Sequence, residues 1–246
     1  MVSELRIDRV LAPNPGPFTL TGTNTWIASV GREAIVIDPG PRLADHEAAI
    51  VQGLGERKPS AILVTHNHED HAPLANPLAR HFDVPAYGHT PGPDFEPDLS
   101  LVEGDRLPLG ESELLVLATP GHSDDHLCFQ IDRILFSGDH IMGGSSVMVE
   151  DLARYLGSLR RLRPLGLERI YPGHGLEIDK PDEVIDWYLA HRLQREREIL
   201  AAMEAGARTV PEIVEVVYRE VDPSLHSLAA VSVAAHLQKL EEAGPG

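Results

Sequence analysis

Short apolar runs along the chain each end in a compact group of polar residues, and this pattern recurs five times. The runs cover residues 34–37, 61–64, 114–118, 133–137 and 168–171. Apolar runs of this length, bounded by turn residues, are typical of buried strands. Because open α/β sheets gather functional residues at the carboxyl ends of their strands, we expect the five polar groups to meet at one edge.

The segments between these runs predict the remaining elements. Residues 24–30 pair with 34–37, and 127–131 with 134–137, as two hairpins. Apolar residues at helical spacing predict two helices, one around Leu43, Ile50 and Leu54 and one around Leu152, Leu156 and Leu159. Residues 85–97 are rich in proline and are expected to lack regular structure. The alternation of strands and helices predicts a mixed α/β class.

The character of the sequence changes after Lys180. Pro181, followed by acidic residues, predicts the start of a helix that ends at Gly206. Two more helices are expected at residues 209–220 and 225–242, and together they resemble a helix-turn-helix. We therefore divide the chain into a main domain, residues 1–205, and a small helical subdomain, residues 206–246. An apolar face is expected to pack within the chain, with a dimer contact as the alternative; it comprises Ala229, Ala230, Val233, Ala234 and Leu237.

Composition limits the classes of function. The chain has 246 residues, 42% of them apolar, and no stretch long enough to predict a membrane span. Residues 1–4 lack the features of a signal peptide, so we expect a cytoplasmic protein. A formal charge of −17 argues against a mainly electrostatic grip on nucleic acid or anionic membrane. The single cysteine, Cys128, excludes an internal disulfide and a thiolate-rich metal site, and its apolar neighbours predict a buried residue.

Residues 65–71, Thr-His-Asn-His-Glu-Asp-His, carry the densest chemistry of the chain. Imidazole and carboxylate suit zinc, whereas calcium and magnesium sites are built from oxygen alone. Other His and Asp residues follow predicted strands at glycine-containing turns, and the whole candidate set is His66, His68, Asp70, His71, His122, Asp139 and His174. About six ligands and a bridge are enough for two metal ions. An ordinary core or surface role is expected for His46, His81, His89, His191, His226 and His236.

This set resembles the metallo-β-lactamase superfamily, whose signature is H-x-H-x-D-H followed by a distant histidine, an aspartate and a last histidine. The resemblance implies an αββα sandwich with two zinc ions per chain. One zinc would be held by His66, His68 and His122, the other by Asp70, His71 and His174, with Asp139 as the bridge. It also implies that Asp38 orients ligands from behind the site, with Thr65 as a similar candidate. The alternatives are a turn-forming aspartate and a plain strand end.

A narrower resemblance is to the beta-lactamase-like protein 2 branch. It rests on the peptides at residues 14–17, 22–25, 119–126, 136–139 and 171–175. That branch includes a mitochondrial single-strand RNA endoribonuclease, fungal polyketide-type thioesterases and many bacterial hydrolases, and its members carry a winged-helix-like C-terminal subdomain. This chain departs from the pattern in leaving little room for a β wing. Lys239 is also the only lysine or arginine between residues 225 and 242, which disfavours a recognition helix.

The expected reaction is hydrolysis. Zinc lowers the pKa of bound water toward neutrality, so a hydroxide shared by two metals is the expected nucleophile. Asp139, as the bridge, and Asp70, as a group that handles protons, are the catalytic candidates. Ser123, Ser145 and Ser146 are expected to be turn or substrate-loop residues rather than nucleophiles.

Three functions remain open at this level. Hydrolysis of a thioester or another activated acyl small molecule needs only the metal centre and a pocket. Cleavage of single-stranded RNA needs a basic path, for which the candidates are Arg154, Arg160, Arg161 and Arg163, with Arg192, Arg195 and Arg197. We expect these arginines to lie on solvated helix faces with acidic partners. The third function is metal-dependent binding of nucleic acid or a partner without catalysis; the substrate, the choice of zinc over iron or manganese, and the oligomeric state stay undetermined.

Overall fold

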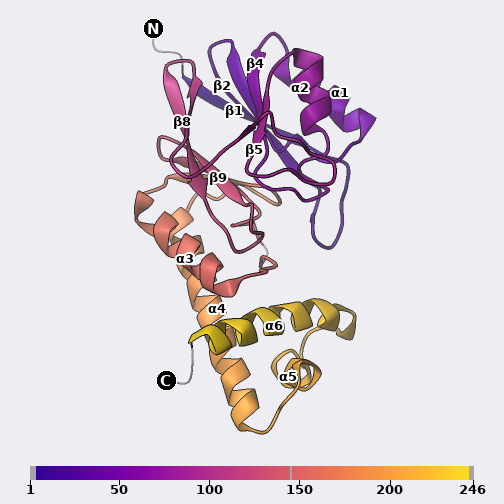
Figure 1. The fold of residues 1–246 in the computed structure, drawn as a ribbon, viewed down its shortest axis with the longest axis vertical. Coiled ribbons are helices and arrows are strands. Elements are labelled where there is room, and N and C mark those ends of the chain that lie inside the picture. Colours follow the sequence, from indigo (N-terminus) through magenta and orange to yellow (C-terminus); the bar gives the residue numbers. More distant parts are fainter. Residues whose placement is uncertain (1–3, 145, 244–246) are drawn as a thin grey trace.

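Two mixed sheets lie face to face, and helices cover the outer face of each, as Figure 1 shows. This computed structural model describes residues 4–144 and 146–243. The chain is a mixed α/β protein with the predicted αββα sandwich, followed by a helical extension. Ser145 and residues 244–246 of the predicted subdomain lie outside the described residues.

The first sheet holds its strands in sequence order: β1 (Leu5–Leu11), β2 (Asn24–Val30), β3 (Glu33–Ile37), β4 (Lys58–Leu63), β5 (Ala86–Gly88) and β6 (Leu99–Ser100). The first three pair antiparallel and the remaining ones parallel. Side chains of β2 alternate between the faces, as a period of two requires. Trp26 and Ala28 face the second sheet, whereas Ile27 packs with helices α1 (Ala44–Leu54) and α2 (Ala75–Phe82).

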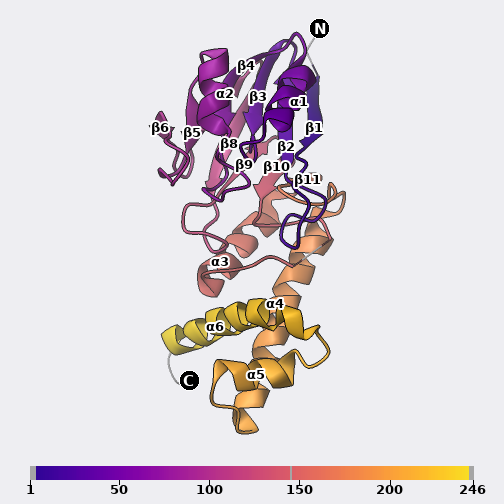
Figure 2. The ribbon, with the colours of Figure 1, turned by 90° about the vertical axis from the view of Figure 1, so that its right-hand side faces the viewer.

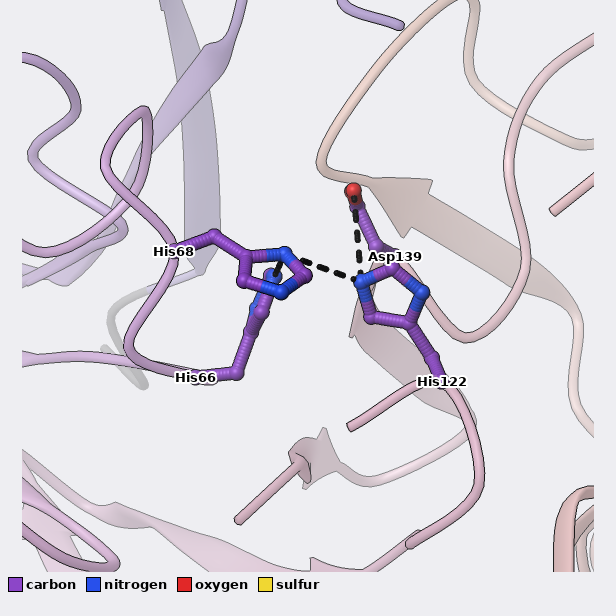
Figure 3. Close-up of side chains that lie close together, drawn as sticks. All are labelled: His66, His68, His122 and Asp139. Atoms are coloured by element: carbon purple, nitrogen blue, oxygen red, sulfur yellow. Dashed lines mark hydrogen bonds and ion pairs between the residues drawn. The ribbon is translucent and has the colours of Figure 1, made fainter. Parts of the chain in front are cut away.

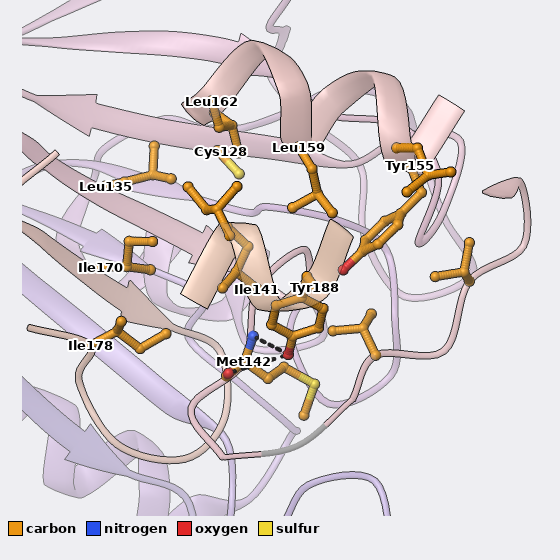
Figure 4. Close-up of a cluster of buried hydrophobic side chains, with 14 of the residues drawn as sticks. Cys128, Leu135, Ile141, Met142, Tyr155, Leu159, Leu162, Ile170, Ile178 and Tyr188 are labelled. Atoms are coloured by element: carbon orange, nitrogen blue, oxygen red, sulfur yellow. Dashed lines mark hydrogen bonds between the residues drawn. The ribbon is translucent and has the colours of Figure 1, made fainter. Parts of the chain in front are cut away.

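The second sheet has the order β11 (Arg169–Pro172), β10 (Ile134–Gly138), β9 (Leu127–Ile131), β8 (Ser112–Ala118) and β7 (Arg106–Leu109). Phe129 and Phe136 point inward and complete the core between the sheets. Leu135 and Ile170 point outward and pack against helices α3 (Leu152–Leu162) and α4 (Pro181–Glu204), the cluster drawn in Figure 4. Both predicted hairpins, β2 with β3 and β9 with β10, are confirmed.

Cys128 belongs to this outer cluster, between the second sheet and its helices (Figure 4). Its side chain is fully buried, and burial raises the pKa of the thiol to about 12. A thiol with so high a pKa stays neutral and unreactive at ordinary pH. The predicted role of Cys128 as a buried apolar residue is confirmed.

Helix α4 leaves the sandwich and carries the C-terminal helices, as Figure 2 shows. These are α5 (Val210–Val217) and α6 (His226–Ala243), joined by the short helix η2 (Pro223–Leu225). Thr209 begins α5 with a reciprocal capping box to Glu212. A small core contains Ile199 of α4 together with Ile213, Val214, Ala229 and Val233, and Ala230 and Leu237 pack against it. The predicted apolar face of α6 therefore packs within the chain, except that Ala234 is exposed. Described residues 173–243 contain no strand, so they form no β wing.

The longest helix, α4, spans 24 residues and carries charged side chains along its length. A membrane-spanning helix needs about 20 predominantly apolar residues. In the part of the chain that the structure describes, no helix has both the length and the apolar character needed to cross a membrane.

One prediction about the fold is wrong, and several elements were not predicted. The proline-rich residues 85–97 contain β5, which pairs in parallel with Ile62 and Leu63 of β4. Strand β4 offers unpaired backbone groups at its edge, and β5 forms hydrogen bonds with them. Three residues can therefore form a strand even though the local sequence does not favour one. The unpredicted elements include β1, β7 and α2.

Candidate metal centre

Polar residues follow five strand ends at one edge of the two sheets. Asp38 follows β3, residues 65–71 follow β4, His122 follows β8, Asp139 follows β10 and His174 follows β11. Hydrogen bonds and close contacts link all of these segments, so the predicted meeting of the five polar groups is confirmed.

The first group of candidate ligands contains His66, His68, His122 and Asp139 (Figure 3). His68 Nδ1 lies 2.8 Å from His66 Nε2 and 3.2 Å from His122 Nε2. Asp139 Oδ2 lies 3.8 Å from His122 Nε2. Nitrogens that bind one tetrahedral zinc are about 3.3 Å apart, so the 3.2 Å pair already fits and the 2.8 Å pair needs a small adjustment.

The second group contains Asp70, His71 and His174. Their ligand atoms are close: His174 Nε2 lies 3.1 Å from Asp70 Oδ2 and 3.2 Å from His71 Nε2. Asp139 reaches this group too, with Oδ1 3.4 Å from His71 Nε2 and Oδ2 3.3 Å from His174 Nε2. Its carboxylate therefore lies between the two groups.

Two features of the site fit the binding of a metal cation. Asp139 Oδ1 is buried, and its contact with His71 Nε2 is long, at 3.4 Å, so this oxygen is available to a cation. Gly173 leaves room beside it, because a Cβ atom there would lie 2.5 Å from Asp139 Oδ1 and 2.7 Å from His71 Cε1. The donors are imidazole nitrogen and carboxylate oxygen, which suit zinc and other transition metals.

The carboxylates of the centre are held in their charged form. Burial by itself raises the pKa of Asp139, but the charges of His71 and His174 and their hydrogen bonds outweigh it and hold the pKa well below its usual range. The pKa of Asp70 is lowered for the same reasons. Ionised carboxylates are the form that binds a metal cation.

The histidines divide into two kinds. Burial and cationic neighbours lower the pKa of His66 and of His122, so both rings stay neutral. Burial also lowers the pKa of His71, yet the nearby carboxylates outweigh it and raise that pKa well above its ordinary value. The pKa of His174 is raised to about 9, because hydrogen bonds to Asp139 and Asp70 exceed the effect of burial. These two protons balance the acidic charge that a metal cation would otherwise neutralise.

Asp38 and Thr65 lie directly behind the candidate ligands. Asp38 accepts hydrogen bonds from the Thr65 backbone N–H and hydroxyl, both at 2.8 Å, and from His71 Nδ1 at 3.0 Å. Because the Thr65 hydroxyl donates to Asp38, it accepts from His66 Nδ1 at 2.9 Å. The His66 and His71 rings are each held through Nδ1, so both direct Nε2 toward the candidate metal ligands. Asp38 adopts a left-handed conformation, φ 50°, which these bonds maintain.

We expect Asp38→Asn to lower metal affinity about 10- to 100-fold. Asparagine tolerates the left-handed conformation as well as aspartate does, so the variant removes the negative charge beside His71 without straining the turn. The measurement is a competition titration of the apoprotein with a chelator of known affinity. An unchanged affinity would show that Asp38 serves the turn and not the metal.

Two residues near the centre were not predicted. His126 is buried, and its Nε2 accepts the Asp139 backbone N–H at 3.2 Å while its Nδ1 donates to the Thr119 hydroxyl at 2.8 Å. Thr23 donates to Asp70 Oδ2 at 3.2 Å. A histidine directly before the strand at residues 127–131 was a usable signal for His126, and Thr23 lies within residues 22–25, one of the peptides that carried the narrower resemblance.

The metal centre opens into a cavity of about 790 Å³. Candidate ligands form its floor: His68, Asp70, His122, Asp139 and His174. Apolar side chains form much of its wall, among them Phe18, Met142, Met148 and Val231. Among the described residues that line the cavity there is no lysine or arginine.

Most of the arginines considered for an RNA path have acidic partners, as predicted. The ion pairs join Arg154 to Asp124, Arg161 to Glu103, Arg163 to Asp182 and Asp186, and Arg195 to Glu198. Arg192 contradicts the prediction of a solvated face: it is 5% exposed and donates to the Val147 carbonyl. It stabilises a loop within the fold and offers no charge to a polyanion.

Sequence comparison matches residues 18–174 to the Metallo-beta-lactamase superfamily and residues 209–244 to the Beta-lactamase associated winged helix domain. A Beta-lactamase-like protein 2 homolog of Caenorhabditis elegans is 34% identical, with 95% of this chain and 83% of that protein covered. An Atrochrysone carboxyl ACP thioesterase of Aspergillus chevalieri is 36% identical, with 88% of this chain and 74% of that protein covered. The resemblance to the beta-lactamase-like protein 2 branch is confirmed.

Solved structures of other proteins have the same fold. A metallo-beta-lactamase family protein from Thermus thermophilus superposes with a TM-score of 0.80 at 23% identity, covering 97% of this chain and 94% of that one. TTHA1623 in a di-iron-bound form is 31% identical with a TM-score of 0.58, covering 72% of this chain and 96% of that one. The chain therefore belongs to the metallo-beta-lactamase superfamily and is a metal-dependent hydrolase of that fold.

Proposed function

We propose that this enzyme hydrolyses a thioester or another activated acyl compound and that two zinc ions are its cofactors. The observation that carries the proposal is the seven-residue His and Asp cluster, five members of which form the floor of a cavity. The wall of this cavity is largely apolar, and its lining includes no lysine or arginine among the described residues. The thioesterase of Aspergillus chevalieri, a relative along most of this chain, supports the same class of substrate.

The proposed roles follow from position. His66, His68 and His122 would hold one ion and Asp70, His71 and His174 the other, with Asp139 shared between them. Bound metal supplies an activated water and polarises the acyl carbonyl oxygen. Asp70 lines the cavity with its side chain 20% exposed and Oδ2 3.1 Å from His174 Nε2. From this position Asp70 is the proposed carrier of the proton that the attacking water loses and the departing thiolate gains.

Zinc is preferred to manganese because the donor set is rich in imidazole nitrogen, and to ferrous iron because sites of nitrogen and oxygen ligands bind zinc more tightly. The di-iron form of a solved relative makes iron the chief competitor. Metal analysis of the purified protein, followed by reconstitution with zinc, iron or manganese, tests this choice. Higher turnover with iron than with zinc, at equal metal content, would contradict it.

RNA cleavage is the less favoured function. A single-stranded RNA needs a cationic track for its backbone. Here four of the seven arginines named above are held in ion pairs and Arg192 is buried, which leaves only Arg160 and Arg197 exposed without an acidic partner among the described residues. The cavity beside the metal centre is lined by Glu69 and Glu150.

The deciding experiment compares hydrolysis of a thioester panel and of labelled single-stranded RNA by the zinc-loaded protein. Asp70→Asn is the control, because it keeps the shape of the side chain and removes its charge. Thioester hydrolysis that disappears in the variant supports the proposal. RNA cleavage that disappears in the variant, without thioester hydrolysis, overturns it in favour of the nuclease.

A further inference from the structure

One side of the cavity beside the metal centre is apolar. We call it the apolar wall: Phe18 from the segment before β2, Met142 and Met148 from the segment between β10 and α3, and Val231 from α6. Phe18, Met148 and Val231 are 52%, 38% and 43% exposed. Large apolar side chains that face water around one cavity gain free energy when an apolar group covers them.

Hydrogen bonds hold the wall in place. His122 Nδ1 donates to the Met148 carbonyl at 2.7 Å, so a candidate metal ligand and a wall residue are tied together. Arg192 of α4 donates to the Val147 carbonyl, one residue before Met148. The Met142 backbone N–H donates to the Tyr188 hydroxyl at 3.3 Å, as Figure 4 shows. The segment between β10 and α3 is therefore anchored both at the centre and on α4.

Val231 reaches the cavity because α6 docks on the main domain. Ala235, one helical turn after Val231, is buried in the core cluster of α3 and α4. Residues four apart lie on the same helix face, so the contact at Ala235 directs Val231 toward the sandwich. The C-terminal helical subdomain thus contributes directly to the cavity wall.

The charges around the wall oppose anions. Apart from the candidate metal ligands, Glu69 and Glu150 are the ionisable side chains among the described residues that line the cavity. A carboxylate or phosphate placed along the wall, away from the metal centre, would meet like charge without a lysine or arginine in the cavity lining to pair with it. An uncharged apolar group meets no such penalty and covers the exposed wall.

We propose that the apolar wall is an acyl subsite that selects uncharged, apolar acyl groups, and that Phe18 and Val231 determine this specificity. The inference rests on the proposed acyl hydrolysis and names its substrate class. The acyl carbonyl lies at the metal centre, and the acyl chain extends along Met142 and Met148 toward α6. The C-terminal subdomain then acts in substrate selection.

The test uses thioesters that share one small neutral leaving group, N-acetylcysteamine. Acetyl, hexanoyl and decanoyl substrates vary the apolar length, and an adipoyl substrate carries a carboxylate in place of the terminal methyl group of hexanoyl. We expect kcat/KM to rise about two- to fourfold per methylene until the wall is covered. The adipoyl substrate is expected to fall about tenfold or more below the hexanoyl substrate.

The variants are Phe18→Ala and Val231→Ala, which truncate side chains that are already half exposed and so spare the fold. Each is expected to lower kcat/KM for decanoyl about threefold or more and to leave acetyl unchanged. Val216→Ala is the matched control, since Val216 is a 53% exposed valine on α5 that does not line this cavity. We expect Val216→Ala to leave kcat/KM for both the acetyl and the decanoyl substrate unchanged.

A binding measurement separates this inference from the proposed function. Calorimetric titration of the zinc-loaded protein with acetate and with decanoate needs no turnover, and decanoate is expected to bind more tightly through contacts that Val231→Ala weakens. Tight decanoate binding without thioester hydrolysis would support the subsite and refute the proposed reaction. Thioester hydrolysis that is independent of chain length and unaffected by Phe18→Ala and Val231→Ala would overturn the subsite and leave the reaction standing.

Discussion

Asp139→Asn is expected to abolish two-metal binding and to lower hydrolysis by on the order of a thousandfold. The carboxylate lies between the two ligand groups, 3.8 Å from His122 Nε2 and 3.3 Å from His174 Nε2. An amide has the same shape but no charge, so it is a weaker ligand for a divalent cation. Loss of the Asp139 charge also removes a negative charge that raises the pKa values of His71 and His174.

The measurement is metal content per chain after equilibration with excess zinc, followed by an assay on the substrate that the wild type hydrolyses. Metal binding stabilises a folded protein by mass action, so a chelator should lower the Tm of the wild type and leave that of the variant almost unchanged. Circular dichroism provides the control for folding. Two equivalents of metal in the variant, with activity within tenfold of wild type, would refute the shared role of Asp139.

Gly121→Ala is expected to lower the free energy of unfolding by about 3 kcal/mol or more. Gly121 has φ +133°, and a Cβ atom there would lie 2.4 Å from both N and Cα of Tyr155 in α3. Backbone atoms of a helix cannot move aside for a methyl group. The Gly121 carbonyl also accepts the N–H groups of Glu150 and Asp151 at 2.9 and 3.0 Å, so displacement would disturb the start of α3.

Gly157→Ala is the matched control for this variant. It adds a methyl group on α3 itself, where no described atom outside the neighbouring helix backbone lies within 4 Å of the new Cβ. Alanine favours a helix over glycine, so we expect Gly157→Ala to stabilise the protein by about 0.5–1 kcal/mol. Urea unfolding monitored by circular dichroism measures both. Equal effects of the two variants would show that the approach of Gly121 to α3 is not required.

The sequence predicted the centre better than it predicted the surroundings. The ligand candidates were recognisable because three imidazoles and two carboxylates stand within residues 65–71, where an ordinary surface would not collect them. The strands before them were recognisable because apolar residues run uninterrupted to each polar turn. Both signals are local in the sequence, and the folded αββα sandwich contains both the strands and the ligand cluster.

Contacts between distant segments were not predictable in the same way. The short strand β5 forms because β4 offers a partner, although residues 85–97 read as a broken loop. Arg192 is buried although its sequence neighbours indicate a solvated helix face. In each case the free energy of packing and pairing across the fold exceeds the local preference.

The sequence by itself determined the class of the fold, the residues available to hold metal ions and the helical nature of the C-terminal region. Only the tertiary structure decided that His126 accepts the Asp139 N–H and that Val231 of α6 lines the cavity. The physical reason is separation along the chain. Asn24 and Trp26 both donate to the Pro172 carbonyl, about 150 residues away, and such contacts depend on the packing of the whole protein.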